Sequence, residues 1–399
     1  MRLGPLFRLV ERGCQVCKVR GFVGLSGAAL ADPLDADEQV LMKLFGTAPI
    51  TADMFTPAFL SQASLTQILS VFDQTRTIVG APLSITKMAD GYVVGTALYK
   101  VPVTIKLDSD GRIASMLIKT PIQNFKDPTD ILAAIGALNG KVAYLVTKNG
   151  EVLYAQQQTA PLAVSSGFKL GVLAVLNDEI AAGRLSWDHV VKLGAPDLSL
   201  PPGEMQSMPA GAPVTVHTLA AFMISQSDNT ATDALMNLVG PDKVAKKLGV
   251  DFVLTTGEFY KLKADPALRL RFGGADATIR QTIAQEMSKM PLPDAGDVGA
   301  PLDPGIEWYL SSTKLCSLIE EVAGLDVFQI NPGVASKADW AQIAFKGGSE
   351  VGVASLTSAL TDKSGAHYCV SVIANDSQPL AEGTITSLYS TLIAKLAAN

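Results

Sequence analysis

The sequence predicts an α+β protein with two domains. Its 399 residues exceed the size of one average domain. Hydrophobic residues make up 48% of the chain and charged residues 18%, so the chain can bury a large core and is not disordered as a whole. In the longer, carboxy-terminal part, strand-like segments stand at both ends of a helical middle. This order predicts one antiparallel sheet flanked by helices, plus an all-helical subdomain, preceded by a smaller α+β domain.

Residues 1–31 have the composition of an export signal. The first twenty residues are basic, and a short, weakly apolar stretch follows at 21–31. This stretch ends in Ala29-Leu30-Ala31, an A-x-A pattern typical of a cleavage site. We therefore expect cleavage after Ala31, no integral membrane segment after cleavage, and a periplasmic or secreted protein. A disordered cytoplasmic tail is the alternative.

The charged and metal-binding residue types exclude several kinds of partner. The net charge of −6 argues against nucleic acid. The three histidines and four cysteines form neither H-E-x-x-H nor paired C-x-x-C motifs, so no metal and no cofactor is expected. Cys14 and Cys17 form one C-x-x-C, but it lies inside the expected signal and would be lost on cleavage. Cys316 and Cys369 could pair, although one possible pair in a sequence proves nothing about geometry.

Residues 32–126 are predicted to form the smaller domain. Apolar residues at helical spacing come first, around 41–45 and 65–72. Strand-like runs follow at 83–88, 92–98, 101–107 and 113–118. Helices followed by a strand meander resemble a cystatin-like or NTF2-like fold, for which we expect a packing or substrate-shaping role. The polar stretch at 123–129 marks the domain boundary.

Residues 127–399 are predicted to form the larger domain. A short helix begins at about Asp130, and strands at 141–147 and 151–157 are joined by Asn149-Gly150, a hairpin signal. A helical region extends to about Leu248. Strands return at 341–345, 351–360 and 367–374, and a helix at about 382–398 closes the chain.

The candidate nucleophile lies in an S-x-x-K motif formed by Ser166 and Lys169. On a helix these positions share a face, so the Lys amine can take the proton of the Ser hydroxyl once burial and nearby positive charge lower its pKa. The same pattern also begins at Ser84 and at Ser311. The first lies in a predicted strand, where the two side chains point to opposite faces. The other has no partner motifs after it.

Two later motifs complete a constellation with Ser166. Ser227-Asp228-Asn229 follows a predicted helix, and Lys346-Gly347-Gly348 follows a strand-like run. Ser227 can relay a proton to a leaving nitrogen, and Asn229 can hydrogen-bond a substrate amide. Lys346 supplies positive charge to the site and to a substrate carboxylate. Gly347 and Gly348 let the substrate backbone approach the strand, and the N–H groups of Ser166 and Ser349 are candidate oxyanion donors.

The motif order S-x-x-K, S-D-N, K-x-G resembles the serine β-lactamase and penicillin-binding protein family. Residues 170–193 and 218–240 are also similar to the class A β-lactamase segments after the nucleophile and around S-D-N. The resemblance covers most of residues 140–399 and implies a class A β-lactamase-like domain at 127–399. It also implies catalytic roles for Ser166, Lys169, Ser227 and Lys346.

The sequence departs from the class A pattern at two places. The E-x-x-L-N motif, whose Glu activates the deacylating water, is not found between Thr230 and Lys346. Glu258 is the nearest candidate, but its neighbours do not match, and we expect an exposed or salt-bridged loop carboxylate there. Gly347 replaces the hydroxyl residue of K-T-G. Both departures leave acylation plausible and make efficient antibiotic hydrolysis doubtful.

These observations predict an exported serine hydrolase that forms an acyl-enzyme on a small-molecule amide, β-lactam or ester. A cell-wall peptidase or an esterase using the same site is the nearest alternative. A non-catalytic penicillin-fold binding protein is the alternative from another functional class.

Overall fold

The computed structural model describes residues 35–89, 91–96, 98–119, 121–125, 127–298 and 302–398. The chain divides into two compact units, Met1–Lys126 and Asp127–Asn399. The predicted export signal and its two cysteines lie outside the described residues. No helix in the described part of the chain is long and apolar enough to cross a membrane.

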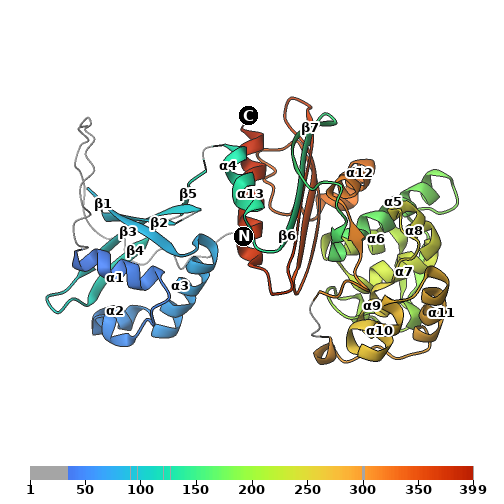
Figure 1. The fold of residues 1–399 in the computed structure, drawn as a ribbon, viewed down its shortest axis with the longest axis horizontal. Coiled ribbons are helices and arrows are strands. Elements are labelled where there is room, and N and C mark those ends of the chain that lie inside the picture. The colour runs from blue at the N-terminus through green and yellow to red at the C-terminus, as the bar shows by residue number, and fades with distance from the viewer. Residues whose placement is uncertain are drawn as a thin grey trace. The chain divides into compact units, whose positions relative to one another are not determined.

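Unit 1 packs helices against an antiparallel meander (Figure 1). Side-chain oxygens cap each helix: Asp35, Thr56 and Ser64 accept backbone N–H bonds from the first turns. Phe45 and Phe72 meet edge to face in the core, with ring centroids 5.7 Å apart. The helices are α1 (Ala36–Phe45), α2 (Pro57–Gln62) and α3 (Leu65–Val79), with a 3₁₀ turn η2 (Ala52–Met54). The strands are β1 (Pro82–Met88), β2 (Gly91–Thr96), β3 (Tyr99–Leu107), β4 (Ile113–Ile118) and β5 (Ile122–Gln123).

The order of elements in unit 1 agrees with the helices and strands predicted from the sequence, apart from α2 and β5, which were not predicted. The strands pair in the order β1-β2-β3-β4, and β5 pairs with β3. Assignment of this unit to a cystatin-like or NTF2-like fold stays a prediction.

Unit 2 is built on a five-stranded antiparallel sheet in the order β12-β13-β14-β6-β7. Figure 1 shows α4 and α13 on one face of this sheet and the other helices of the unit beyond the opposite face. The predicted sheet with flanking helices is therefore confirmed. The strands are β6 (Lys141–Lys148), β7 (Glu151–Gln156), β12 (Gln342–Glu350), β13 (Val353–Thr361) and β14 (His367–Asn375). The predicted hairpin joins β6 to β7, and Asn149 and Gly150 both take positive φ, 51° and 83°.

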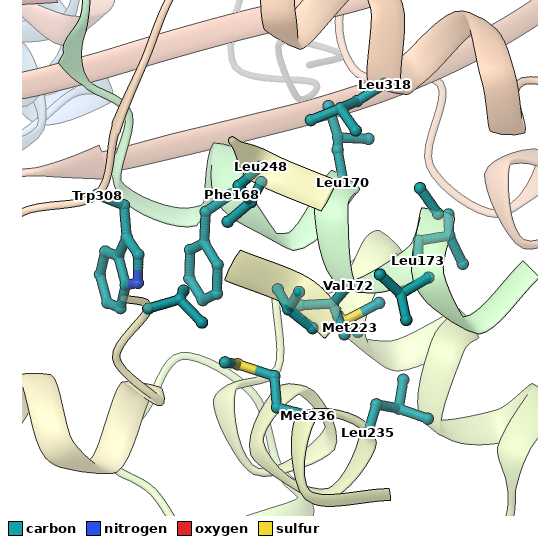
Figure 2. Close-up of a cluster of buried hydrophobic side chains, with 14 of the residues drawn as sticks. Phe168, Leu170, Val172, Leu173, Met223, Leu235, Met236, Leu248, Trp308 and Leu318 are labelled. Atoms are coloured by element: carbon teal, nitrogen blue, oxygen red, sulfur yellow. The ribbon is translucent and has the colours of Figure 1, made fainter. Parts of the chain in front are cut away.

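The helical part of unit 2 surrounds α5, whose residues 169–176 are all buried. Figure 2 shows Leu170, Val172 and Leu173 of α5 among Met223, Leu235, Met236 and Leu248 from three neighbouring helices. The helices are α4 (Pro128–Gly136), α5 (Lys169–Ala181), α6 (Val216–Ser225), α7 (Asn229–Val239), α8 (Pro241–Leu248), α9 (Thr256–Ala264), α10 (Pro266–Gly273), α11 (Ala277–Met287), α12 (Ser312–Val322) and α13 (Glu382–Ala397).

Short elements connect the sheet to the helices. Two-stranded pairs form between β8 (Leu162–Ala163) and β11 (Tyr309–Leu310), and between β9 (Val190–Lys192) and β10 (Pro213–Thr215). The 3₁₀ turns are η3 (Ser165–Phe168), η4 (Ala195–Asp197), η5 (Met205–Ser207), η6 (Ala295–Asp297) and η7 (Asp326–Gln329). Cys316 of α12 and Cys369 of β14 form a disulfide, which ties the helical part to the sheet.

Candidate active site

The nucleophile turn leads from β8 through η3 into α5. Its backbone is held from the sheet: the hydroxyl of Ser355 on β13 donates to the carbonyl of Val164 at 2.7 Å, and that of Ser165 donates to the carbonyl of Ser349 at 3.2 Å. Ser165 has a φ of 45°, a left-handed conformation unusual for a residue other than glycine. This turn leaves Ser166 half-buried at the start of a helix, where its side chain lines a pocket.

An aromatic stack fixes the direction of α5. The ring of Phe168 lies parallel to Trp308, with centroids 4.3 Å apart (Figure 2), and Phe259 of α9 packs on the same indole at 4.4 Å. The indole N–H of Trp308 donates to the carbonyl of Leu254 at 3.1 Å, so the buried ring has its polar partner. The nucleophile turn and α9 therefore share one rigid support.

The S-D-N segment joins α6 to α7. Ser227 has a φ of 58°, again in the left-handed region. Asp228 caps α7 by accepting the N–H of Ala231 at 2.8 Å, and its other oxygen accepts the N–H groups of Glu204 and Met205. Asp228 thus braces the loop beside the pocket.

Lys169 is fully buried and points at the S-D-N segment. Its Nζ donates to the carbonyl of Ser227 at 2.6 Å, to the Ser227 hydroxyl at 3.3 Å and to Oδ1 of Asn229 at 2.6 Å. Burial, and then the charge of Lys346, holds the pKa of Lys169 well below its ordinary value. The three contacts use all the donors of the protonated amine, and loss of one proton leaves two N–H groups and a lone pair that can act as a base.

Lys346 approaches the same hydroxyl from β12. Its Nζ donates to Oγ of Ser227 at 3.0 Å and also to the carbonyl of Gly347. Burial lowers the pKa of Lys346 to about 7. The sequence suggested that this strand ends before Lys346. In the structure β12 instead continues to Glu350, in unbroken register with β13.

Gly348 is required by close packing between β12 and the nucleophile turn. A Cβ at this position would lie 2.7 Å from the backbone nitrogen of Ser166 and would collide with the carbonyl of Val164. Any larger residue would push the strand away from Ser166. Gly347 has more room: its nearest side-chain neighbour is the ring of Phe345.

The motifs surround one pocket of about 240 Å³. Its lining includes Ser166, Ser227, Gly347, Gly348 and Ser349, together with Pro202, Ala354, Leu356, Glu382, Ile385 and Thr386. Lys169 and Lys346 lie beneath the lining and reach it through Ser227. Asn229 is placed differently: only 2% of it is exposed, and it is not part of the lining.

Neither of the two other S-x-x-K sequences contributes a residue to the lining of this pocket. Ser84 lies in β1 of unit 1. Ser311 is the N-cap of α12, and its hydroxyl accepts the N–H of Lys314 at 3.1 Å. Within the described residues, no group of three or more His, Cys, Asp or Glu is arranged to hold a metal ion.

Glu258 lies in a helix rather than in the loop expected from the sequence. It is neither exposed nor salt-bridged: its carboxylate accepts the N–H of Thr255 at 2.8 Å and closes a capping box at the start of α9. Burial raises the pKa of Glu258. The T-x-x-E spacing of residues 255–258 is a local helix-start signal that sequence reasoning missed.

Three further residues that bear on the site were not found from the sequence. Asp233 of α7 accepts the N–H groups of Thr256 and Gly257, both at 2.7 Å, and so anchors the start of α9. Tyr260 of α9 contacts the side chain of Asn229. Asp265 and Leu268 stand in a D-x-x-L sequence, a weak variant of the E-x-x-L pattern, but the Asp265 carboxylate caps α10 by accepting two backbone N–H groups.

Comparison with known families finds a match to part of unit 2. Residues 126–291 match the beta-lactamase enzyme family. Unit 2 is a β-lactamase-like domain. The match contains Ser166, Lys169 and the S-D-N segment of this domain, whereas Lys346 lies beyond it and joins the site through the sheet.

Solved structures with similarity to the β-lactamase-like domain have low sequence identity to it. The β-lactamase from Sphaerobacter thermophilus is 19% identical with a TM-score of 0.48, over 67% of this chain and 96% of its own. PBP-A is 14% identical with a TM-score of 0.47, and the alignment covers 68% of this chain and 95% of PBP-A. A β-lactamase from Xanthomonas campestris is 14% identical with a TM-score of 0.48, and the alignment covers 68% of this chain and 96% of that enzyme. No curated protein matches the chain.

Proposed function

We propose that the β-lactamase-like domain is a serine hydrolase in which Ser166 forms an acyl-enzyme with a β-lactam, amide or ester carbonyl. One observation supports this most directly. The hydroxyl of Ser227 lines the same pocket as Ser166 and accepts hydrogen bonds from the two buried amines, Lys169 and Lys346.

The proposed chemistry assigns a role to each of these groups. A bond forms between Oγ of Ser166 and the carbonyl carbon as the carbon–nitrogen or carbon–oxygen bond of the substrate breaks. The proton of Ser166 passes to the neutral amine of Lys169 and then, through Ser227, to the leaving atom. In this proposal protonated Lys346 attracts a substrate carboxylate, and the N–H groups of Ser166 and Ser349 are the donors to the developing oxyanion. Water then releases the acyl group from Ser166.

Turnover is proposed to be slow for penicillins and faster for small activated esters. A deacylating water needs a general base. Neither Glu258 nor Asp265 is available for that task, because each carboxylate caps a helix. Lys169 then has to activate water, and a bulky penicilloyl group would crowd it. Stable acylation with little turnover also suits a penicillin-binding protein.

Export of the protein and the role of unit 1 are further parts of this proposal. Export to the periplasm or the exterior is supported by the Cys316–Cys369 disulfide, since disulfides persist in oxidising compartments. Unit 1 is proposed to be a packing or substrate-shaping domain of the cystatin or NTF2 type, because its helices precede and pack on a strand meander.

Incubation with a fluorescent penicillin followed by intact-mass analysis tests the proposed reaction. We expect one covalent adduct that disappears in Ser166→Ala and persists in the matched variants Ser84→Ala and Ser311→Ala. Fast loss of substrate without an adduct indicates an efficient β-lactamase. Labelling that survives Ser166→Ala, or no reaction of the parent with penicillins and esters, would contradict the assignment.

A further inference from the structure

The side chain of Asn229 has all its hydrogen-bonding groups engaged. A primary amide offers two N–H donors. The Nδ2 group of Asn229 donates to the carbonyl of Leu200 at 2.8 Å and to the hydroxyl oxygen of Tyr260 at 3.1 Å. Its oxygen accepts from Lys169. In this arrangement Asn229 has no N–H left for a substrate.

Tyr260 is held in this position by a second contact. Its hydroxyl donates to the carbonyl of Pro201 at 3.0 Å while its oxygen accepts from Asn229. The backbone N–H of Asn229 also donates to the carbonyl of Pro202 at 3.0 Å. Asn229 and Tyr260 therefore bind three consecutive carbonyls, those of residues 200–202.

This small network borders the active-site pocket. Pro202 lines the pocket together with Ser166 and Ser227. Tyr260 is partly exposed, whereas Asn229 is buried. The helix of Tyr260, α9, is anchored separately, because the backbone N–H groups of Thr256 and Gly257 donate to Asp233. The Tyr260 hydroxyl is therefore presented to Asn229 by a supported helix.

We propose that Tyr260 is a specificity-determining residue that closes the amide-binding position at Asn229. This inference rests on the proposed acylation of Ser166. A substrate with an acylamino group must displace the Tyr260 hydroxyl before its amide oxygen reaches an N–H of Asn229. A substrate without that group has no such requirement. The site therefore favours acyl donors that lack an acylamino substituent beside the reacting carbonyl.

The test compares two penicillins that differ in this group. Benzylpenicillin carries the acylamino substituent, and 6-aminopenicillanic acid does not. Tyr260→Phe keeps the ring but removes the oxygen that accepts from Asn229. We expect the ratio of acylation rate constants, benzylpenicillin over 6-aminopenicillanic acid, to rise about 3- to 10-fold, the size of one hydrogen bond. Tyr154→Phe, on β7, is the matched control and should leave the ratio unchanged.

A binding measurement separates this proposal from the proposed reaction. In the Ser166→Ala background, Tyr260→Phe should tighten equilibrium binding of benzylpenicillin relative to 6-aminopenicillanic acid by a similar factor. Thermal unfolding checks that each variant is folded. An unchanged or lower ratio in folded Tyr260→Phe, by either measurement, overturns the role of Tyr260. Failure of both penicillins and of activated esters to acylate the parent overturns the proposed reaction instead, and the binding comparison still decides the role of Tyr260.

Discussion

The amine of Lys169 lies 2.6 Å from the backbone carbonyl of Ser227, and the same amine reaches the Ser227 hydroxyl at 3.3 Å. This contact joins the helix of the nucleophile to the S-D-N segment across 58 positions of sequence. It gives the base and the proposed proton relay a fixed separation. The consequences for rate, pH dependence and stability can each be measured.

The first prediction concerns the conformation and the hydroxyl of Ser227. Its positive φ is unfavourable for any residue with a Cβ. Ser227→Gly should therefore be more stable than Ser227→Ala by about 1 kcal/mol. Both variants should acylate about 10²- to 10⁴-fold more slowly than the parent, because both lack the relay hydroxyl. Urea unfolding and stopped-flow acylation measure the two effects. Acylation at the parental rate in either variant would remove Ser227 from the mechanism.

The second prediction concerns pH and Lys346. With a pKa of about 7, Lys346 is protonated below pH 7 and neutral above it. Attraction of a substrate carboxylate should therefore weaken as the pH rises through 7. The ratio of acylation rate constants, benzylpenicillin over the uncharged p-nitrophenyl acetate, should fall by up to about tenfold per pH unit above 7.

Lys346→Arg provides the control for this pH effect. Arginine stays charged throughout this range, so the decline in the ratio should disappear. Deprotonation of Lys169 affects both substrates and cancels in the ratio. A parental ratio that stays flat between pH 6 and 9 would mean that Lys346 does not select the carboxylate.

The third prediction concerns Glu258 and deacylation. Glu258 closes the capping box of α9, and Gln can make the same contact. Glu258→Gln should change the decay rate of the penicilloyl adduct less than about twofold, since a capping residue takes no part in proton transfer. Timed intact-mass analysis measures the decay. Rapid penicillin turnover in the parent that vanishes in Glu258→Gln would show that Glu258 is the general base.

The fourth prediction concerns the disulfide between Cys316 and Cys369. Replacing both cysteines by alanine should lower the free energy of unfolding by about 2–4 kcal/mol, because the cross-link restricts the unfolded chain. Ser317→Ala, next to Cys316 on an exposed face of α12, is the control and should have little effect. Denaturant unfolding under non-reducing conditions measures the change. Equal stability of the double variant and the parent would contradict a structural role for the bond.

The same disulfide bears on export. Amino-terminal sequencing of the protein from its native envelope should begin at or near Asp32, following cleavage after Ala31. Non-reducing analysis of that material should show the Cys316–Cys369 bond. Recovery of intact residues 1–31 in a cytosolic fraction would argue against export.

The sequence alone predicted the strands of the larger sheet and Ser166 as the candidate nucleophile, but not the helices α9 to α12 beyond Leu248. Alternation of apolar residues and the Asn149-Gly150 turn predicted the strands of the sheet because these signals act between near neighbours. The order of three short motifs singled out Ser166 from Ser84 and Ser311. One local signal, the T-x-x-E sequence before α9, was available and was missed, which is why Glu258 was expected in a loop.

Tertiary structure decided what these residues can do. The lowered pKa values of Lys169 and Lys346 come from burial, which is created by segments far apart in the chain. The sequence predicts Asn229 as a substrate donor, but only the folded chain brings Tyr260 to its amide and leaves it no N–H to offer. Hydrogen bonds between distant side chains depend on how helices pack, and no local pattern of residues carries that information.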